Sequence, residues 1–121
     1  MEYRRRPSSW IDSDKMKEIV DKRAATVLVL LEELESILNA KNERNWLRGI
    51  QAAIAELQKK EGRADSEGFE NARSIYLTMI AGGRGFSEYF IWDNDEDGRF
   101  AANAKLDQIR ERLWVLFNAV V

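Results

Sequence analysis

Apolar residues recur at steps of four and three through the first third of the chain, which is the period of one face of an α-helix. The set is Met16, Val20, Ala24, Val27, Leu31, Leu34 and Leu38. This spacing predicts a helix over residues 13–40, with Asp12 as its N-cap. Further apolar residues lie off this stripe, namely Val29, Leu30 and Ile37. Because a helix that is apolar on several sides needs several packing partners, we expect it to be the spine of a bundle.

The same period returns in three later segments. The second helix is predicted to follow Asn42 as its N-cap and to end before Gly62, the third to begin near Ser66, and the last near Asn103. The apolar positions of the second are Trp46, Ile50, Ala53 and Leu57. Those of the third are Phe69, Ala72, Tyr76, Met79 and Ile80. Those of the last are Leu106, Ile109, Leu113, Leu116, Phe117 and Val120.

No segment of useful length alternates apolar and polar residues as a strand does. Residues 86–92 could form one or two turns of helix or a short extended piece, and the favoured prediction is a short helix capped by Ser87. The sequence therefore predicts an all-α protein, an antiparallel helical bundle of four main helices plus one short helix. Residues 11–121 would form a single domain, and residues 1–10, which include three consecutive arginines, a flexible basic N-terminal arm.

Charge balance and residue types exclude several functions. With 19 Lys and Arg against 21 Asp and Glu, the chain lacks the basic excess that phosphate binding requires, so we expect no nucleic-acid partner. Neither His nor Cys is present, which removes the commonest general base and the most reactive nucleophile. We therefore expect no enzyme activity and no cofactor.

The hydrophobic pattern also bears on location. The longest apolar run, Ala24–Leu31, is interrupted only by Thr26 and is much shorter than the roughly 20 residues that span a bilayer. The basic start of the chain is not followed by the apolar core of a secretory signal. We expect the mature chain to begin here, with no membrane association and with the cytoplasm as its location.

The densest charge lies between Arg84 and Arg99, where the sequence has carboxylates and no cation. The carboxylates are Glu88, Asp93, Asp95, Glu96 and Asp97, and the neighbouring aromatics are Tyr89, Phe90 and Trp92. Such a surface suits a cation or a basic partner. Tyr89 and Trp92 are interpreted either as interface anchors beside this turn or as packing residues.

A metal site is one alternative for the acidic turn. Asp93, Asp95, Asp97 and Gly98 match positions one, three, five and six of an EF-hand calcium loop. Position twelve, which needs a glutamate, falls on Ala104. These three aspartates are therefore weak candidates for a calcium site, and a solvated acidic turn is the simpler alternative.

Other features have simpler explanations. The Gly82-Gly83-Arg84-Gly85 loop follows a helix and lacks the Gly-Lys-Ser/Thr ending of a phosphate-binding loop, so it is interpreted as a tight connection. Arg84 remains a candidate contact residue on it. The aromatics on predicted core faces are expected to fill the bundle. They are Trp46, Phe69, Tyr76, Trp114 and Phe117.

Three short motifs in the second half resemble a family of small, all-helical bacterial proteins of unknown function. They are Ala72-Arg73-Ser74-Ile75-Tyr76, Gly83-Arg84-Gly85-Phe86-Ser87-Glu88 and Leu106-Asp107-x-x-Arg110-x-Arg112-Leu113-Trp114. Members of that group resemble immunity proteins encoded beside polymorphic toxins. The resemblance covers roughly residues 28–118 and departs at the acidic insertion 93–98.

This resemblance implies a bacterial immunity protein that neutralises a cognate toxin by binding and occluding its active site. A toxin with a basic active-site groove would meet complementary charge here. The expected charged contacts are Asp93, Asp95, Glu96 and Asp97, the anchors Tyr89 and Trp92, and the lesser contacts Arg84 and Glu88. Two alternatives stay open: a calcium-binding helical module and a self-associating structural subunit. The sequence leaves the choice between monomer and dimer undetermined.

Overall fold

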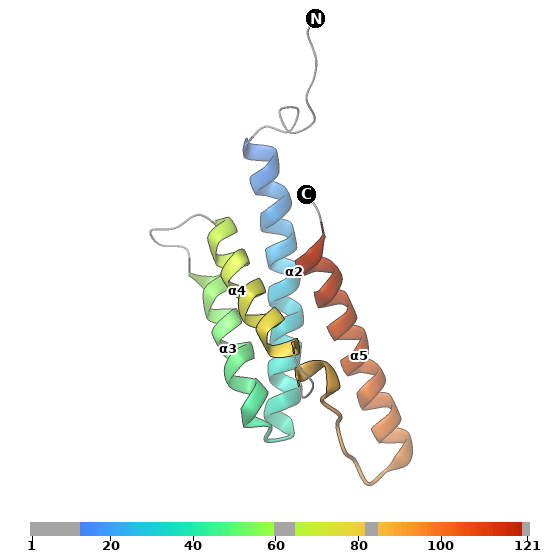
Figure 1. Ribbon diagram of the computed structural model, residues 1–121. Helices are drawn as coiled ribbons and strands as arrows, with labels where there is room; N and C mark the ends of the chain where they lie inside the picture. Colours follow the sequence, from blue (N-terminus) through green and yellow to red (C-terminus); the bar gives the residue numbers. More distant parts are fainter. Residues whose placement is uncertain (1–12, 60–64, 82–84, 120–121) are drawn as a thin grey trace, which may run out of the picture.

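The computed structural model describes residues 13–59, 65–81 and 85–119. Within these ranges the chain forms helices and no strand. The elements are α2 (Ser13–Ala40), α3 (Arg44–Gln58), α4 (Asp65–Ile80), the 3-10 helix η1 (Phe86–Glu88) and α5 (Glu96–Asn118). Successive α-helices run in opposite directions (Figure 1). The predicted all-α bundle of four main helices and one short helix is confirmed.

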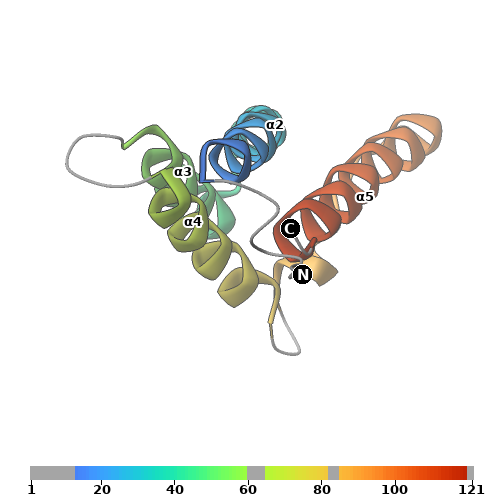
Figure 2. The same ribbon diagram turned by 90° about the horizontal axis from the view of Figure 1, so that it is seen from above.

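Helix α2 is the spine of this bundle, as its apolar pattern predicted. It contacts α3, α4 and α5. Seen from above, α3 and α4 lie on one side of α2 and α5 lies on the other (Figure 2). Leu34 and Leu38 are fully buried, and Leu30, which lies off the main stripe, is buried as well. Val29 is exposed, so only part of the second apolar face is covered. The predicted N-cap Asp12 lies outside the described residues.

Aromatic rings fill the core where the helices meet. Phe86 packs against Trp46 at 5.6 Å and against Tyr76 at 6.3 Å between ring centroids. Phe117 packs against Phe69 at 5.4 Å and Tyr76 at 5.5 Å. Burial raises the pKa of the Tyr76 hydroxyl well above its ordinary value. Four of the five aromatics predicted to fill the bundle therefore do so.

Trp114 is the exception, because it is 52% exposed. The buried positions of α5 include Leu106, Ile109, Leu113 and Phe117. Residue 114 follows Leu113 by about 100° around the helix axis, which turns its side chain away from these core positions. Its predicted placement in the core was wrong because the helical angle of residue 114, and not its aromatic character, decides which way the side chain faces.

The connection from α2 to α3 differs from the prediction at one residue. Asn42 has a left-handed backbone with φ 58° and ends α2 instead of capping α3. The N–H of Glu43 donates to Leu38 O at 2.9 Å and that of Asn42 to Asn39 O at 3.1 Å, the bonds of a Schellman motif. Glu43 is the N-cap of α3, and its carboxylate accepts from the Asn45 N–H at 3.2 Å.

The predicted short helix over residues 86–92 is also shorter than expected. Only Phe86–Glu88 is helical, and Gly85 precedes it as the flanking residue. Ser87 lies inside η1, where its hydroxyl donates to Ile80 O at 3.3 Å, so its assignment as the cap was wrong. A Cβ on Gly85 would lie 2.6 Å from Ala81 O, and this close backbone approach explains the glycine.

Among the residues that the structure describes, no helix is both long enough and apolar enough to cross a membrane.

Candidate functional site

The acidic turn forms the N-terminal cap of α5. Asp95 is the N-cap, and its carboxylate accepts from the Gly98 N–H at 2.7 Å. Glu96 and Asp97 occupy the first turn, where unpaired N–H groups and the helix dipole favour negative charge. The helix therefore begins at Glu96 and not near Asn103. Three of the acidic residues in this turn are therefore explained by their position at the start of a helix.

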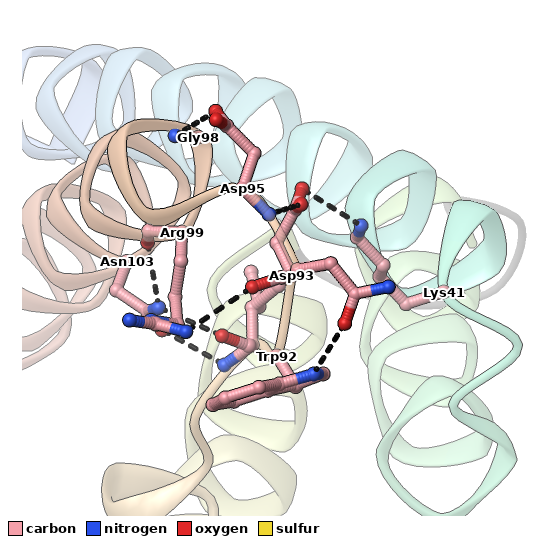
Figure 3. A network of polar contacts seen from close by, with 9 residues as sticks. Lys41, Trp92, Asp93, Asp95, Gly98, Arg99 and Asn103 are labelled. Carbon is pink, nitrogen blue, oxygen red and sulfur yellow. Dashed lines mark hydrogen bonds and ion pairs between the residues drawn. The ribbon is translucent and has the colours of Figure 1, made fainter.

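A second local bond orders the residues just before the cap. Asp93 Oδ1 accepts from the Asp95 N–H at 2.9 Å, an Asx-turn geometry (Figure 3). Asp93 and Asp95 each use an oxygen on the backbone of their own turn. In the described part of the chain, no group of three or more His, Cys, Asp or Glu residues is placed to hold a metal ion.

Asn103 holds the segment between η1 and the turn against α5. Its side chain accepts from the Ile91 N–H at 2.8 Å and donates to Ile91 O at 2.9 Å, as a neighbouring strand would. It also donates to Arg99 O at 2.8 Å (Figure 3). Ile91 itself is buried. These bonds fix the path of residues 89–95, which carry the predicted site.

Two cations that are separate in the sequence lie beside this turn. The guanidinium of Arg99 lies 4.5 Å from the ring centroid of Trp92 and donates to Asp93 O at 3.3 Å. Lys41, which directly follows α2, places its Nζ 4.0 Å from Asp93 Oδ2. The Trp92 indole N–H donates to Asn94 Oδ1 at 3.3 Å. Asp93 is therefore partly neutralised, and one face of Trp92 is covered by Arg99 (Figure 3).

Tyr89 packs against the core with part of its side chain and is not fully available to a partner. It is half-buried, and its ring stacks on Phe86 at 5.9 Å between centroids. Burial, and secondarily the carboxylate of Glu43, raise the pKa of its hydroxyl. Arg110 donates to Tyr89 O at 3.0 Å and to Phe86 O at 2.6 Å, which ties η1 to α5.

Large aromatic side chains are exposed around the start of α5. Phe90 is 57% exposed, Trp92 66% and Phe100 78%. Phe90 and Phe100 line a hollow of about 340 Å³ at this end of the helix. The other lining residues are Glu96, Arg99, Asn103, Ala104 and Asp107. Exposed aromatics beside carboxylates form a surface suited to a protein partner.

The structure places the predicted site residues in two groups. Trp92 and the carboxylates of residues 93–97 lie together at the cap of α5. Glu88 is exposed at the end of η1, next to the half-buried Tyr89. Arg84 lies outside the described residues.

Sequence reasoning missed Phe100 as an exposed residue because it began the helix too late. A helix that starts at Glu96 places residue 100 about 120–180° around the axis from Leu106 and Ile109, away from the core. The signal for that start was present, since Asp95 followed by Glu96 and Asp97 is typical of a helix N-terminus. The contacts of Arg99 and Asn103 had no such signal, because they depend on the folded path of residues 89–95.

Comparisons with protein-family models, with curated proteins and with solved structures found no match for this chain. Two motif arginines have structural partners. Arg73 of α4 donates through Nε to Phe117 O at 2.8 Å, and Arg110 pairs with Asp107 as well as with the carbonyls near η1. These residues join α4, η1 and α5, so the motifs that carry the resemblance also have a role in packing.

Proposed function

We propose that this chain is an immunity protein that binds a cognate bacterial toxin domain and occludes its active site. The observation that carries the proposal is the combination of exposed aromatics and carboxylates at the start of α5. Phe90, Trp92 and Phe100 are each more than half exposed, beside Glu96 and Asp97. The resemblance of three sequence motifs to immunity-like proteins adds the class of partner.

The local structure suits tight binding in two ways. Asp95 and Asn103 hold the backbone of the surface through hydrogen bonds before any partner arrives, which lowers the entropy lost on binding. Among the described residues, Glu96 and Asp97 form no ion pair, so their charge remains available to a basic groove. Complementary charge would speed encounter, and the aromatics would supply buried contact area.

The binding test is co-purification of the tagged chain with the polypeptide encoded beside it in its genome. The informative charge variant is Glu96→Gln with Asp97→Asn, because neither side chain makes the cap bond of Asp95. A matched control neutralises two acids of α2, Glu32→Gln with Glu35→Gln. We expect the wild type and the control to retain the complex, and the α5 variant to lose most of it at physiological salt.

Each other result overturns part of the proposal. A complex that is indifferent to the α5 variant would mean that the interface lies on another face. Absence of any complex with the wild type would contradict the immunity function with that partner. A toxin that stays active within a stable complex would contradict occlusion of the active site.

Self-association is a second candidate, favoured by the same exposed aromatics. A second copy that covers Phe90 and Phe100 would bury them without a different protein. The full chain would then elute as a dimer at micromolar concentration, and Phe100→Ala would shift it toward the monomer. Monomeric elution of the wild type would remove this candidate.

A further inference from the structure

A second hollow continues the first along α5. It has a volume of about 240 Å³ and lies between α5, α4 and η1. Its lining residues are Tyr76, Ile80, Ser87, Asp107, Arg110, Glu111 and Trp114. Asp107 lines both hollows, so they are neighbours along α5. The two together are called the α5 groove below.

The α5 groove follows one face of the helix. Phe100, Ala104, Asp107, Glu111 and Trp114 succeed one another at steps of four and three, which is the spacing of a single helix face. Phe100 and Trp114 are 14 residues apart, or about 21 Å along the axis. Both are more than half exposed, so the groove has an aromatic side chain toward each end.

The charge of the residues that line the α5 groove is negative and only partly compensated. Carboxylates of Glu96, Asp107 and Glu111 line the groove. Its two arginines are already engaged. Arg99 covers Trp92 and donates to Asp93 O, and Arg110 holds η1 and pairs with Asp107. Among the described residues, neither Glu96 nor Glu111 has an ion-pair partner, which favours cations from outside.

We propose that the α5 groove binds a basic amphipathic helix of the partner protein. Such a helix would place one apolar side chain against Phe90 and Phe100 and another, about four turns away, against Trp114. Lys or Arg residues between them would face Asp107 and Glu111. The proposal deepens the immunity function and rests on it for the identity of the partner, but the chemistry of the groove can be tested without that partner.

The test uses a synthetic peptide as the probe. It is an 18-residue helix with leucines 14 positions apart on one face and arginines between them, titrated into the ¹⁵N-labelled full chain. Binding is followed through amide shifts and the indole N–H of Trp114. A matched peptide with glutamate in place of each arginine is the charge control. We expect the basic peptide to bind and to shift the amide resonances of Phe100, Glu111 and Trp114. Its binding should weaken as the salt concentration is raised.

Variants of exposed residues separate the groove from general charge attraction. Glu111→Gln, Trp114→Ala and Phe100→Ala are each expected to raise the Kd of the basic peptide by about tenfold. Val29→Ala is the control, because Val29 is 55% exposed on α2 and lines neither hollow. Asp107 is left unchanged, since its pairing with Arg110 supports the fold. Thermal melting of each variant checks that it is folded.

The outcomes separate this inference from the function it refines. No binding of the basic peptide at millimolar concentration, equal binding of both peptides, or shifts away from the groove would overturn the inference. If the natural complex forms but ignores the groove variants, the groove proposal fails and the immunity function stands. If the peptide binds in the groove and no natural complex forms, the groove stands and the immunity function fails.

Discussion

The two ends of α5 are stabilised by different parts of the chain. At the C-terminal end, Arg23 of α2 donates to Ala119 O at 2.8 Å and Arg73 of α4 donates to Phe117 O at 2.8 Å. Side chains from two other helices therefore satisfy the last carbonyls. At the N-terminal end, Asp95 caps the helix from the adjacent residue. The first end is tied to the bundle, and the second is capped locally.

The side chains follow the same division. Leu113 and Phe117 are buried near the C-terminal end, whereas Phe100 near the start is 78% exposed. In Figure 1 the start of α5 also extends beyond the neighbouring ends of α2 and α3. A helix end that caps itself needs few tertiary contacts, which leaves its side chains available to a partner. Carboxylates at the start of a helix therefore have two possible roles, capping the helix and binding a partner, and the two must be told apart residue by residue.

The largest expected effect compares one aromatic residue from each end. Phe117→Ala should lower the free energy of unfolding by about 3–5 kcal/mol, because it empties a buried site between Phe69 and Tyr76. Phe100→Ala should change it by less than about 0.5 kcal/mol. Urea denaturation of both variants measures the difference. Similar losses would mean that the start of α5 is part of the core.

A second prediction concerns the capping from other helices. Arg73→Met should lower the free energy of unfolding by about 2 kcal/mol, since it removes charged hydrogen bonds to the end of α5. Arg112→Met, an exposed arginine on α5 itself, is the matched control and should have little effect. Equal stability of the two variants would show that the hydrogen bonds of Arg73 do not stabilise the C-terminal end of α5.

A third prediction concerns the local cap. Asp95→Ala should lower the free energy of unfolding by about 1 kcal/mol, because the Gly98 N–H loses its acceptor. Asp97→Ala should lower it by less, since Asp97 acts through the helix dipole. Thermal unfolding compares the two, and hydrogen exchange should show faster opening of the first turn in the Asp95 variant alone. Exchange that is unchanged there would contradict the assignment of Asp95 as the cap.

The smallest effect at neutral pH involves the two tyrosines. Their ordinary pKa is 10.0, and burial raises it in the folded chain. Below pH 10 both states keep the proton and stability is unaffected; above pH 10 only the unfolded chain releases it readily, so stability falls as pH rises. Tyr76→Phe should reduce this loss more than Tyr89→Phe, because Tyr76 is the more buried. Melting temperatures of both variants, measured from pH 8 to pH 11, test this order. A larger reduction of the loss in Tyr89→Phe would contradict it.

Helical periodicity predicted most of the fold because it depends on burial, which follows the repeat of the helix. It located α2, α3 and α4 and the buried face of α5. It failed where one residue type suits two structures. Asn42 is common both at N-caps and in left-handed C-terminal turns, and only the backbone angle separates them. The aspartates of residues 93–97 match the first half of a calcium loop and also suit the start of a helix.

The sequence predicted which segment carries the candidate site, but not the contacts within it. The acidic run and Trp92 lie in a region where the structure places exposed aromatic side chains beside carboxylates, and their role as a binding site stays a prediction. The contact of Arg99 with Trp92 and the clamp of Asn103 on Ile91 depend on how residues 89–95 fold back on α5. Trp114 joins the same surface only through the rotation of α5. Such long-range relations are absent from local residue patterns.

Whether the start of α5 is the interface is tested most directly by the Kd of the complex with the polypeptide encoded beside this chain. Phe100→Ala and Val29→Ala both truncate exposed apolar side chains, on α5 and α2 respectively. If the start of α5 is the interface, Phe100→Ala should raise the Kd by about tenfold or more and Val29→Ala should leave it unchanged. Wild-type affinity in the Phe100 variant, or a loss confined to the Val29 variant, would contradict the account.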